Sequence, residues 1–303
     1  MTRIVVTGGS GKAGQAVVSD LVAHDFDVVN VDVVPATDGR LHSVRADLTD
    51  FGETVGALRG ADAVIHLAAI PAPGIRTIER TFDINVRSTY NVFSAAEVCK
   101  VGRVVWASSE TVLGLPFGRR HARNLLDPVA APGHHPQPDY LPIDEAHPVR
   151  PHSSYSLSKV LGEEMARQFA RWTGIPFIGL RFSAIREPAE YERFPDDWSD
   201  PHRGEWNAWG YVDARDVAQA CRLAATAHVA GAEVFIVAAA DTVMDRPNSE
   251  LVAECFPSVP LRDGTGERDT LLAIDKARSL LGYEPAHSWR DTVAVRAATT
   301  GAR

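Results

Sequence analysis

A tyrosine and a lysine that stand four residues apart, Tyr155 and Lys159, are the side chains best placed to do chemistry in this sequence. Their spacing puts the phenol and the ammonium on one face of a helix, where the cation stabilises a phenolate. Bringing a phenol pKa from about 10 to near neutrality needs roughly 4 kcal/mol of charge stabilisation. The pair predicts an acid/base tyrosine, although the same spacing is common on solvent-exposed helices.

A second group of residues forms a glycine-rich turn, with Gly8, Gly11 and Gly14 spaced as Gly-x-x-Gly-x-x-Gly. The first glycine permits a tight turn, the second lets the backbone approach a diphosphate, and the third lets a helix pack closely on a strand. The helix N-terminus would then face the phosphates with its partial positive charge. Together with Lys12 and Ala13, these glycines are the candidate dinucleotide-binding residues.

An aspartate, Asp32, ends the next predicted strand. A carboxylate at this place accepts hydrogen bonds from ribose hydroxyls and repels a 2′-phosphate, which favours NAD over NADP. The alternative is that Asp32 only caps a turn.

These residues need regular elements to hold them, and short β-branched runs alternate with helical patterns along the chain. The alternation, with helices such as Ala13–Ala23 and Ser88–Val98, predicts an α/β, doubly wound parallel sheet, the Rossmann fold. The expected strands are Ile4–Thr7, Val28–Val33, Ala63–Leu67, Arg103–Ala107, Phe177–Arg181 and Val234–Ala238.

The predicted elements divide the chain in two. We expect residues 1–182 to form an NAD-binding Rossmann domain and residues 183–303 to form mainly a small substrate-binding region. Residues 211–240 are expected to return to the Rossmann domain, because the helical pattern of Asp213–Ala227 leads into the last strand. Residues 115–151, rich in Pro, His, Arg and Gly, predict a long surface loop near the active-site mouth.

The composition is that of a globular protein, with 303 residues of which 45% are hydrophobic. A net charge of −8 argues against a nucleic-acid partner, and the chain has no apolar run of about 18 residues that would indicate a membrane span. The first residues lead directly into a strand and leave no room for a signal peptide. We therefore expect a cytoplasmic protein that acts on a small molecule.

The cysteines and histidines do not predict a metal site. Cys99, Cys221 and Cys255 are far apart, which indicates free buried thiols. The loop histidines lack metal-ligand spacing, and we expect them to be solvated. They are His134, His135, His147, His152 and His202.

Several further motifs stand in a fixed order with the residues above. They are Asp47-Leu48, His66-Leu-Ala-Ala69, Asn85-Val86, Val105-Trp-Ala-Ser-Ser109 and Tyr155-x-x-x-Lys159. In this order the chain resembles the extended short-chain dehydrogenase/reductases, and more narrowly the NAD-dependent epimerase/dehydratase group. The resemblance covers most of the first 185 residues and is looser beyond them.

The resemblance implies roles in cofactor binding. Asp47 and Leu48 would border the adenine, and Asn85 would support the catalytic helix. The path of the diphosphate and ribose would be lined by Leu67, Ala68 and Ala69.

The resemblance also implies a catalytic set. Ser109, rather than Ser108, would be the catalytic hydroxyl, and Tyr155 the acid/base. Lys159 would hold the nicotinamide ribose and, with the oxidised nicotinamide, lower the tyrosine pKa. The alternative for Ser109 is a serine that satisfies backbone groups at a strand end.

Departures from the family pattern narrow the range of possible reactions. Ser109-Glu110-Thr111 stands where dehydratases carry Thr-Asp-Glu, which makes dehydratase activity doubtful. The segment Leu180–Ala184 lacks the asparagine of sugar-nucleotide epimerases, and no arginine directly precedes the strand ending at Asp213. Leu180–Pro188 is similar to the uronate dehydrogenases, which oxidise a free sugar acid.

The substrate side is expected after the strand Phe177–Arg181. Its candidate contacts are Ser109, Glu110, Ser183 and Arg186. Arg186 is able to pair with a carboxylate or phosphate, or to bridge Glu187 or Glu190 instead. Three tryptophans either line the pocket or anchor this segment to the core. They are Trp198, Trp206 and Trp209.

The sequence therefore predicts an NAD-dependent oxidoreductase that transfers hydride between nicotinamide and a hydroxyl carbon of a sugar, sugar acid or related polyol. One alternative is a sugar-nucleotide epimerase that retains NAD. The other is a regulator that senses NAD without turnover. A homodimer paired through two long helices is common in the superfamily and is expected here.

Overall fold

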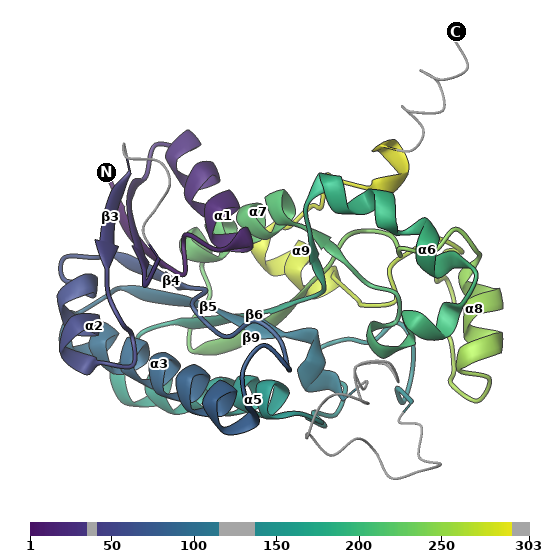
Figure 1. Ribbon diagram of the computed structural model, residues 1–303, viewed down its shortest axis with the longest axis horizontal. Helices are drawn as coiled ribbons and strands as arrows, with labels where there is room; N and C mark the ends of the chain where they lie inside the picture. Colours follow the sequence, from purple (N-terminus) through teal and green to yellow (C-terminus); the bar gives the residue numbers. More distant parts are fainter. Residues whose placement is uncertain (35–40, 115–136, 293–303) are drawn as a thin grey trace, which may run out of the picture.

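The computed structural model describes residues 1–34, 41–114 and 137–292, and its centre is a seven-stranded parallel sheet (Figure 1). The strand order is β3-β2-β1-β4-β5-β6-β9, so the chain starts in the middle of the sheet and winds outward in both directions. This arrangement confirms the predicted α/β, doubly wound Rossmann fold. The strands are β1 (Arg3–Thr7), β2 (Asp27–Asp32), β3 (His42–Arg45), β4 (Ala63–His66), β5 (Arg103–Ser109), β6 (Phe177–Phe182) and β9 (Ala232–Val237).

Helices cover both faces of this sheet (Figure 1). One face carries α1 (Lys12–Ala23) and α7 (Ala214–Thr226), and the other carries α2 (Phe51–Leu58), α3 (Ile78–Val98) and α5 (Ser154–Thr173). Within the described ranges, the helices are too short or too polar to cross a membrane.

Alternate residues of each central strand supply the two layers of the core. Val6 packs in one buried cluster with Leu21 of α1, whereas Val5 packs in another with Phe93 of α3. This alternation follows from the period of two along a strand, and burial on both faces explains why the strands read as continuous apolar runs.

Local sequence fixes both ends of α5, the helix that carries the tyrosine and the lysine. Ser153 and Ser156 form a reciprocal capping box at its N-terminus. Gly174, at φ 74°, ends the helix in the left-handed conformation that glycine adopts without strain. These caps fix the residues at which α5 begins and ends, and Tyr155 and Lys159 lie in its first two turns.

The structure differs from the expected elements in three places. Strand β3 was missed because its exposed, mostly polar residues lack the apolar pattern of a buried strand. Helix α3 begins ten residues before the predicted Ser88, at Ile78, in polar turns that hide the helical period. Residues 115–136 of the predicted surface loop lie outside the described residues. The described part of the predicted loop, residues 137–151, packs against the core, and its Leu141 and Ile143 are fully buried.

The C-terminal part returns to the sheet and also builds a smaller lobe. Strand β9 pairs with β6, and α7 packs against α1. The lobe's short pieces are β7 (Ile185–Arg186), η2 (Pro188–Arg193), α6 (Pro195–Trp198), η3 (Pro201–Arg203), η4 (Glu205–Asn207), β8 (Val212–Asp213), α8 (Asn248–Cys255) and α9 (Asp275–Leu281).

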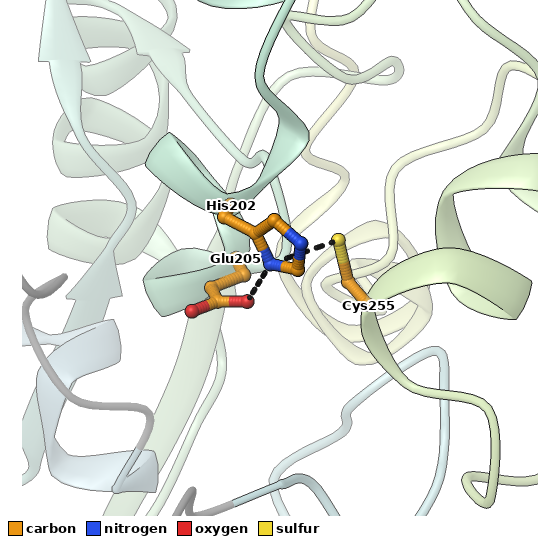
Figure 2. Close-up of side chains that lie close together, drawn as sticks. All are labelled: His202, Glu205 and Cys255. Carbon is orange, nitrogen blue, oxygen red and sulfur yellow. Dashed lines mark hydrogen bonds and ion pairs between the residues drawn. The ribbon is translucent and has the colours of Figure 1, made fainter.

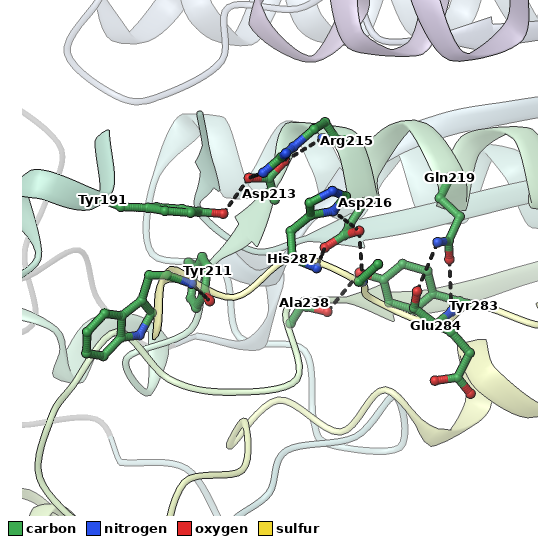
Figure 3. Close-up of polar contacts among 12 residues, drawn as sticks. Tyr191, Tyr211, Asp213, Arg215, Asp216, Gln219, Ala238, Tyr283, Glu284 and His287 are labelled. Carbon is green, nitrogen blue, oxygen red and sulfur yellow. Dashed lines mark hydrogen bonds and ion pairs between the residues drawn. The ribbon is translucent and has the colours of Figure 1, made fainter. Parts of the chain in front are cut away.

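Figure 3 shows the polar network at the start of α7 that ties these pieces together. Asp213 caps the helix by accepting a hydrogen bond from the Arg215 amide at 2.9 Å, and it also accepts from the Tyr191 hydroxyl. The fully buried Asp216 accepts from the amides of residues 286 and 287 and from His287 Nδ1 at 2.7 Å. The C-terminal segment is thereby anchored to α7.

Candidate active site

A cavity of about 1030 Å³ opens where the carboxyl ends of the parallel strands meet. It brings together the predicted cofactor, catalytic and substrate contacts except Asn85, which lies outside its described lining. The predicted residues that line it are Gly8, Gly11, Lys12, Ala13, Gly14, Asp32, Asp47, Leu48, Leu67, Ala68, Ala69, Ser109, Glu110, Tyr155, Lys159, Ser183 and Arg186.

The glycine turn between β1 and α1 fits a dinucleotide. A Cβ on Gly14 would lie 2.1 Å from the Gly8 carbonyl oxygen, so close packing requires glycine there. A Cβ on Gly11 would meet that oxygen at 3.4 Å and would otherwise fill the open cradle. Because Gly11 is also the N-cap of α1, no side chain of the capping residue covers the helix amides, which are suited to a diphosphate.

Asp32 lies at the end of β2, beside this turn. Its carboxylate accepts hydrogen bonds from the Ser10 and Val34 amides, each at 3.1 Å. Asp32 therefore caps a turn and also lines the cavity. Each carboxylate oxygen keeps a lone pair with which to accept a ribose hydroxyl.

Two further contacts shape the cofactor side. Thr49 donates from its amide and its hydroxyl to Asp47, and these hydrogen bonds hold the pKa of that carboxyl below its ordinary value. The buried His66 lies 2.7 Å from the Thr7 hydroxyl. Burial and then the charge of Lys159 lower the His66 pKa to about 3, so the ring is neutral just before Leu67.

Tyr155 and Lys159 extend from α5 toward Ser109 at the end of β5. Lys159 Nζ lies 5.6 Å from the Tyr155 ring centroid and donates to the Ala107 carbonyl at 2.8 Å. Ser109 accepts from the amide and the hydroxyl of Thr111. Ser109 also interacts with the tyrosine hydroxyl.

The pKa values in this group differ from the expectation. Burial and, to a smaller extent, Glu110 raise the Tyr155 pKa to about 12 against the lowering effect of Ser109. Burial lowers the Lys159 pKa to about 8. The expected lowering of the tyrosine pKa by Lys159 is therefore not seen, because burial outweighs an ammonium 5.6 Å from the ring. The charge of an oxidised nicotinamide is the other contribution that was expected.

Asn85 connects the catalytic helix to the loop after β4, although it lies outside the cavity. Its side-chain oxygen accepts from the Ile70 amide at 2.7 Å, and its side-chain nitrogen donates to the Ile70 carbonyl at 3.1 Å. The same nitrogen lies 3.4 Å from the Ser158 hydroxyl, which donates to the Tyr155 carbonyl at 2.6 Å. This geometry agrees with a supporting role.

A buried ion pair that was not predicted lies next to this group of residues. Arg181 on β6 donates twice to Glu163 on α5, at 2.9 and 2.8 Å, and the Ser108 hydroxyl donates to the same carboxylate at 2.7 Å. Ser108 thereby contacts the ion pair, whereas Ser109 contacts Thr111 and Tyr155. An arginine in an otherwise apolar strand was the available signal, because a buried charge needs a partner.

The substrate side contains a buried carboxyl group with a raised pKa, Glu110. Burial raises its pKa to about 8, against the lowering effects of Ser183, Asn207 and Arg186. Asn207 Nδ2 lies 3.5 Å from Glu110 Oε1. At neutral pH this carboxyl is mainly protonated and offers the cavity a hydrogen-bond donor as well as an acceptor.

Of the three candidate tryptophans, one lines the cavity and two anchor their segment to the core. Trp206 lines the cavity. Trp209 is fully buried and donates to the Pro201 carbonyl, and Trp198 donates to the Val243 carbonyl, so both anchor the lobe to the core.

An ion pair crosses from the cofactor side to the lobe. Lys12 Nζ lies 2.6 Å from Glu190 Oε2, and Arg186 lies 3.8 Å from the other oxygen of that carboxylate. Arg186 therefore lines the cavity and bridges Glu190 as well.

Comparison with known proteins agrees with this geometry. A family model described as NAD dependent epimerase/dehydratase matches residues 4–238. L-arabinose 1-dehydrogenase (NAD(P)(+)) of Haloferax volcanii is 31% identical over 202 residues, covering 65% of this chain and 72% of that protein. A putative UDP-glucose 4-epimerase of Methanocaldococcus jannaschii is 31% identical over 193 residues, covering 60% of this chain and 55% of that protein.

A solved structure shows the same fold over the whole chain. It is a short-chain dehydrogenase/reductase superfamily protein from Agrobacterium tumefaciens with bound NAD. The TM-score is 0.70 at 24% identity, with 99% of this chain and 100% of that one covered. With the family model spanning most of its length, the chain belongs to the NAD-dependent epimerase/dehydratase family.

Proposed function

We propose that this NAD-dependent enzyme is a dehydrogenase that oxidises a hydroxyl carbon of a free sugar, sugar acid or related polyol and releases the keto product. The observation that carries the proposal is the convergence of Ser109, Tyr155 and Lys159 in one cavity with the polar group around Glu110.

In this reaction Tyr155 takes the proton of the substrate hydroxyl while the C–H bond of the same carbon breaks and the carbonyl forms. Ser109 orients the hydroxyl and donates to the developing oxyanion. Lys159 holds the ribose, and its ammonium favours the phenolate. NAD, when bound, supplies the hydride acceptor.

A polyhydroxylated substrate suits the lining beyond the tyrosine. Glu110 and Ser183 offer both donors and acceptors, and Trp206 offers an aromatic face for the apolar side of a sugar ring. The relation to an arabinose dehydrogenase supports a small free sugar.

An epimerase that retains NAD is the second candidate, and the relation to a putative UDP-glucose 4-epimerase favours it. The charges of the cavity favour the dehydrogenase. Among the described lining residues the basic side chains are Lys12, Lys159 and Arg186, and both Lys12 and Arg186 face Glu190. A nucleotide diphosphate would have to compete with that carboxylate for its partners.

The deciding experiment follows NADH absorbance while purified protein and NAD meet free sugars, sugar acids and sugar nucleotides. Stoichiometric NADH formation with a free sugar or sugar acid is expected. Isomerised sugar nucleotide without net NADH would replace the dehydrogenase by the epimerase. If no well shows NADH formation or an isomerised sugar nucleotide, the NAD-sensing regulator would be favoured.

We also infer a homodimer formed through α3 and α5. Four large apolar side chains are exposed on these two helices: Tyr90, Val98, Leu157 and Trp172. Because α3 and α5 pack against each other, exposed apolar side chains on this pair of helices support an interface there. A cytoplasmic location stays a prediction.

A further inference from the structure

Three side chains of different ligand types converge away from the active-site cavity (Figure 2). They are His202 of η3, Glu205 of η4 and Cys255 at the end of α8. His202 Nδ1 lies 2.8 Å from a Glu205 carboxylate oxygen and 3.7 Å from the Cys255 sulfur, and the ligand atoms all lie within 4.8 Å of one another.

His202 Nδ1 lies within hydrogen-bonding distance of both other groups. With a proton it donates to Glu205, and without one it accepts from the thiol of Cys255, so it serves one partner fully at a time. A cation between the three atoms would accept a lone pair from each of them.

The spacing also suits a tetrahedral metal. With zinc bonds of about 2.05 Å to nitrogen and 2.3 Å to sulfur, two ligands of one ion stand about 3.6 Å apart. The observed separation of sulfur and Nδ1 is 3.7 Å. The shorter distance from Nδ1 to Glu205 would widen by roughly half an ångström when the metal replaces the hydrogen bond.

Packing already holds the two segments in place. The Trp209 indole donates to the Pro201 carbonyl at 2.7 Å, directly before His202. Its ring packs against Phe256, directly after Cys255, with centroids 5.5 Å apart. The ligands on both segments are thus preorganised, and the half-exposed His202 side chain leaves a path for entry.

We propose that His202, Glu205 and Cys255 bind a zinc ion, with water as the fourth ligand. Burial, and then the nearby carboxylates Glu205 and Glu254, raise the pKa of the Cys255 thiol, so the ion would have to displace the thiol proton when it binds. A solvated His202 and no metal were expected from the sequence, because the loop histidines lack metal-ligand spacing.

Zinc at this place would stiffen one wall of the substrate cavity. Glu205 directly precedes Trp206, which lines the cavity, and Asn207, which contacts Glu110. The ion would link this wall to α8. The site thus has a structural role outside the catalytic group.

The test uses full-length protein freed of metal with a chelator and titrated with zinc alone in a calorimeter. One zinc per chain is expected, and Cys255→Ser and His202→Ala are each expected to weaken binding at least about tenfold. Cys99→Ser, at a thiol in another part of the fold, is the matched control and should bind as the unmodified protein does. Binding that neither ligand variant weakens would overturn the proposal, as would the lack of binding.

A second measurement needs no variant. Cobalt added to the metal-free protein should produce the intense absorption of a thiolate-bound ion, which zinc should then displace. A spectrum without that absorption would remove Cys255 from the site. Because both measurements use the metal alone, their outcome is independent of the dehydrogenase proposal.

Discussion

Tyr155 is the proposed acid/base of the cavity. Its pKa of about 12 means that the free protein keeps the phenol protonated at neutral pH. The hydrogen bond with Ser109 favours the phenolate, and the cofactor would add a positive charge when it binds. Under the proposed mechanism, the tyrosine therefore becomes a base only when the cofactor is bound.

Tyr155→Phe is expected to lower kcat at least about a hundredfold, because it removes proton transfer. NAD affinity should stay nearly unchanged, since the phenyl ring remains. Steady-state rates and cofactor titration by fluorescence measure the two quantities. Tyr90→Phe, at an exposed tyrosine, is the control, and turnover retained by the Tyr155 variant would refute the assigned base.

Asp32→Ala is expected to weaken NAD about tenfold to a hundredfold, the cost of hydrogen bonds to a charged group. NADP should lose little, because the same carboxylate repels its 2′-phosphate. The ratio of kcat/KM for the two cofactors measures the change. An unaltered ratio would remove Asp32 from the ribose site.

Glu110→Gln tests the buried carboxyl through pH. Because folding raises the Glu110 pKa from 4.5 to about 8, its contribution to stability is complete below pH 4.5 and is lost as pH rises toward 8. The difference in unfolding free energy between the native protein and the variant should fall by up to about 1.4 kcal/mol per pH unit in that window. Urea unfolding at several pH values measures it, with Glu97→Gln as the exposed control. A flat difference would show that Glu110 is ionised throughout.

At the scale of elements, α7 depends on a carboxylate inside the fold. Asp216 is fully buried and accepts from two amides and an imidazole of the C-terminal segment (Figure 3). Asp216→Ala is expected to cost about 3 kcal/mol of unfolding free energy, because it leaves three partly buried donors without their acceptor. Chemical denaturation measures it against Asp263→Ala at an exposed site. Equal stability of the two variants would contradict the anchoring role.

Elements defined by local rules were predictable from the sequence. The glycine turn and the spacing of Tyr155 and Lys159 depend on residues close together in the chain, and both lie in the cavity as expected. Contacts between distant segments were not predictable. Neither the pair of Glu163 with Arg181 nor the burial of Trp209 has a periodic pattern, because tertiary packing alone brings the partners together.

For the whole molecule, the exposed apolar face of α3 and α5 predicts self-association. Trp172, 61% exposed, is the largest side chain of that patch. Trp172→Glu should convert a dimer into a monomer, because it introduces a charge into an apolar interface. Light scattering after size exclusion measures the mass. Leu280→Glu, at an exposed leucine of α9, should stay dimeric, and a monomeric native protein would contradict the interface.

The ion pair between Lys12 and Glu190 has a kinetic consequence. A dehydrogenase must exchange its cofactor in every cycle, and any opening that parts α1 from η2 must break this contact. Because both side chains are partly exposed, dissolved salt screens their attraction. The residence time of the cofactor, and with it the ceiling on turnover, should therefore depend on ionic strength.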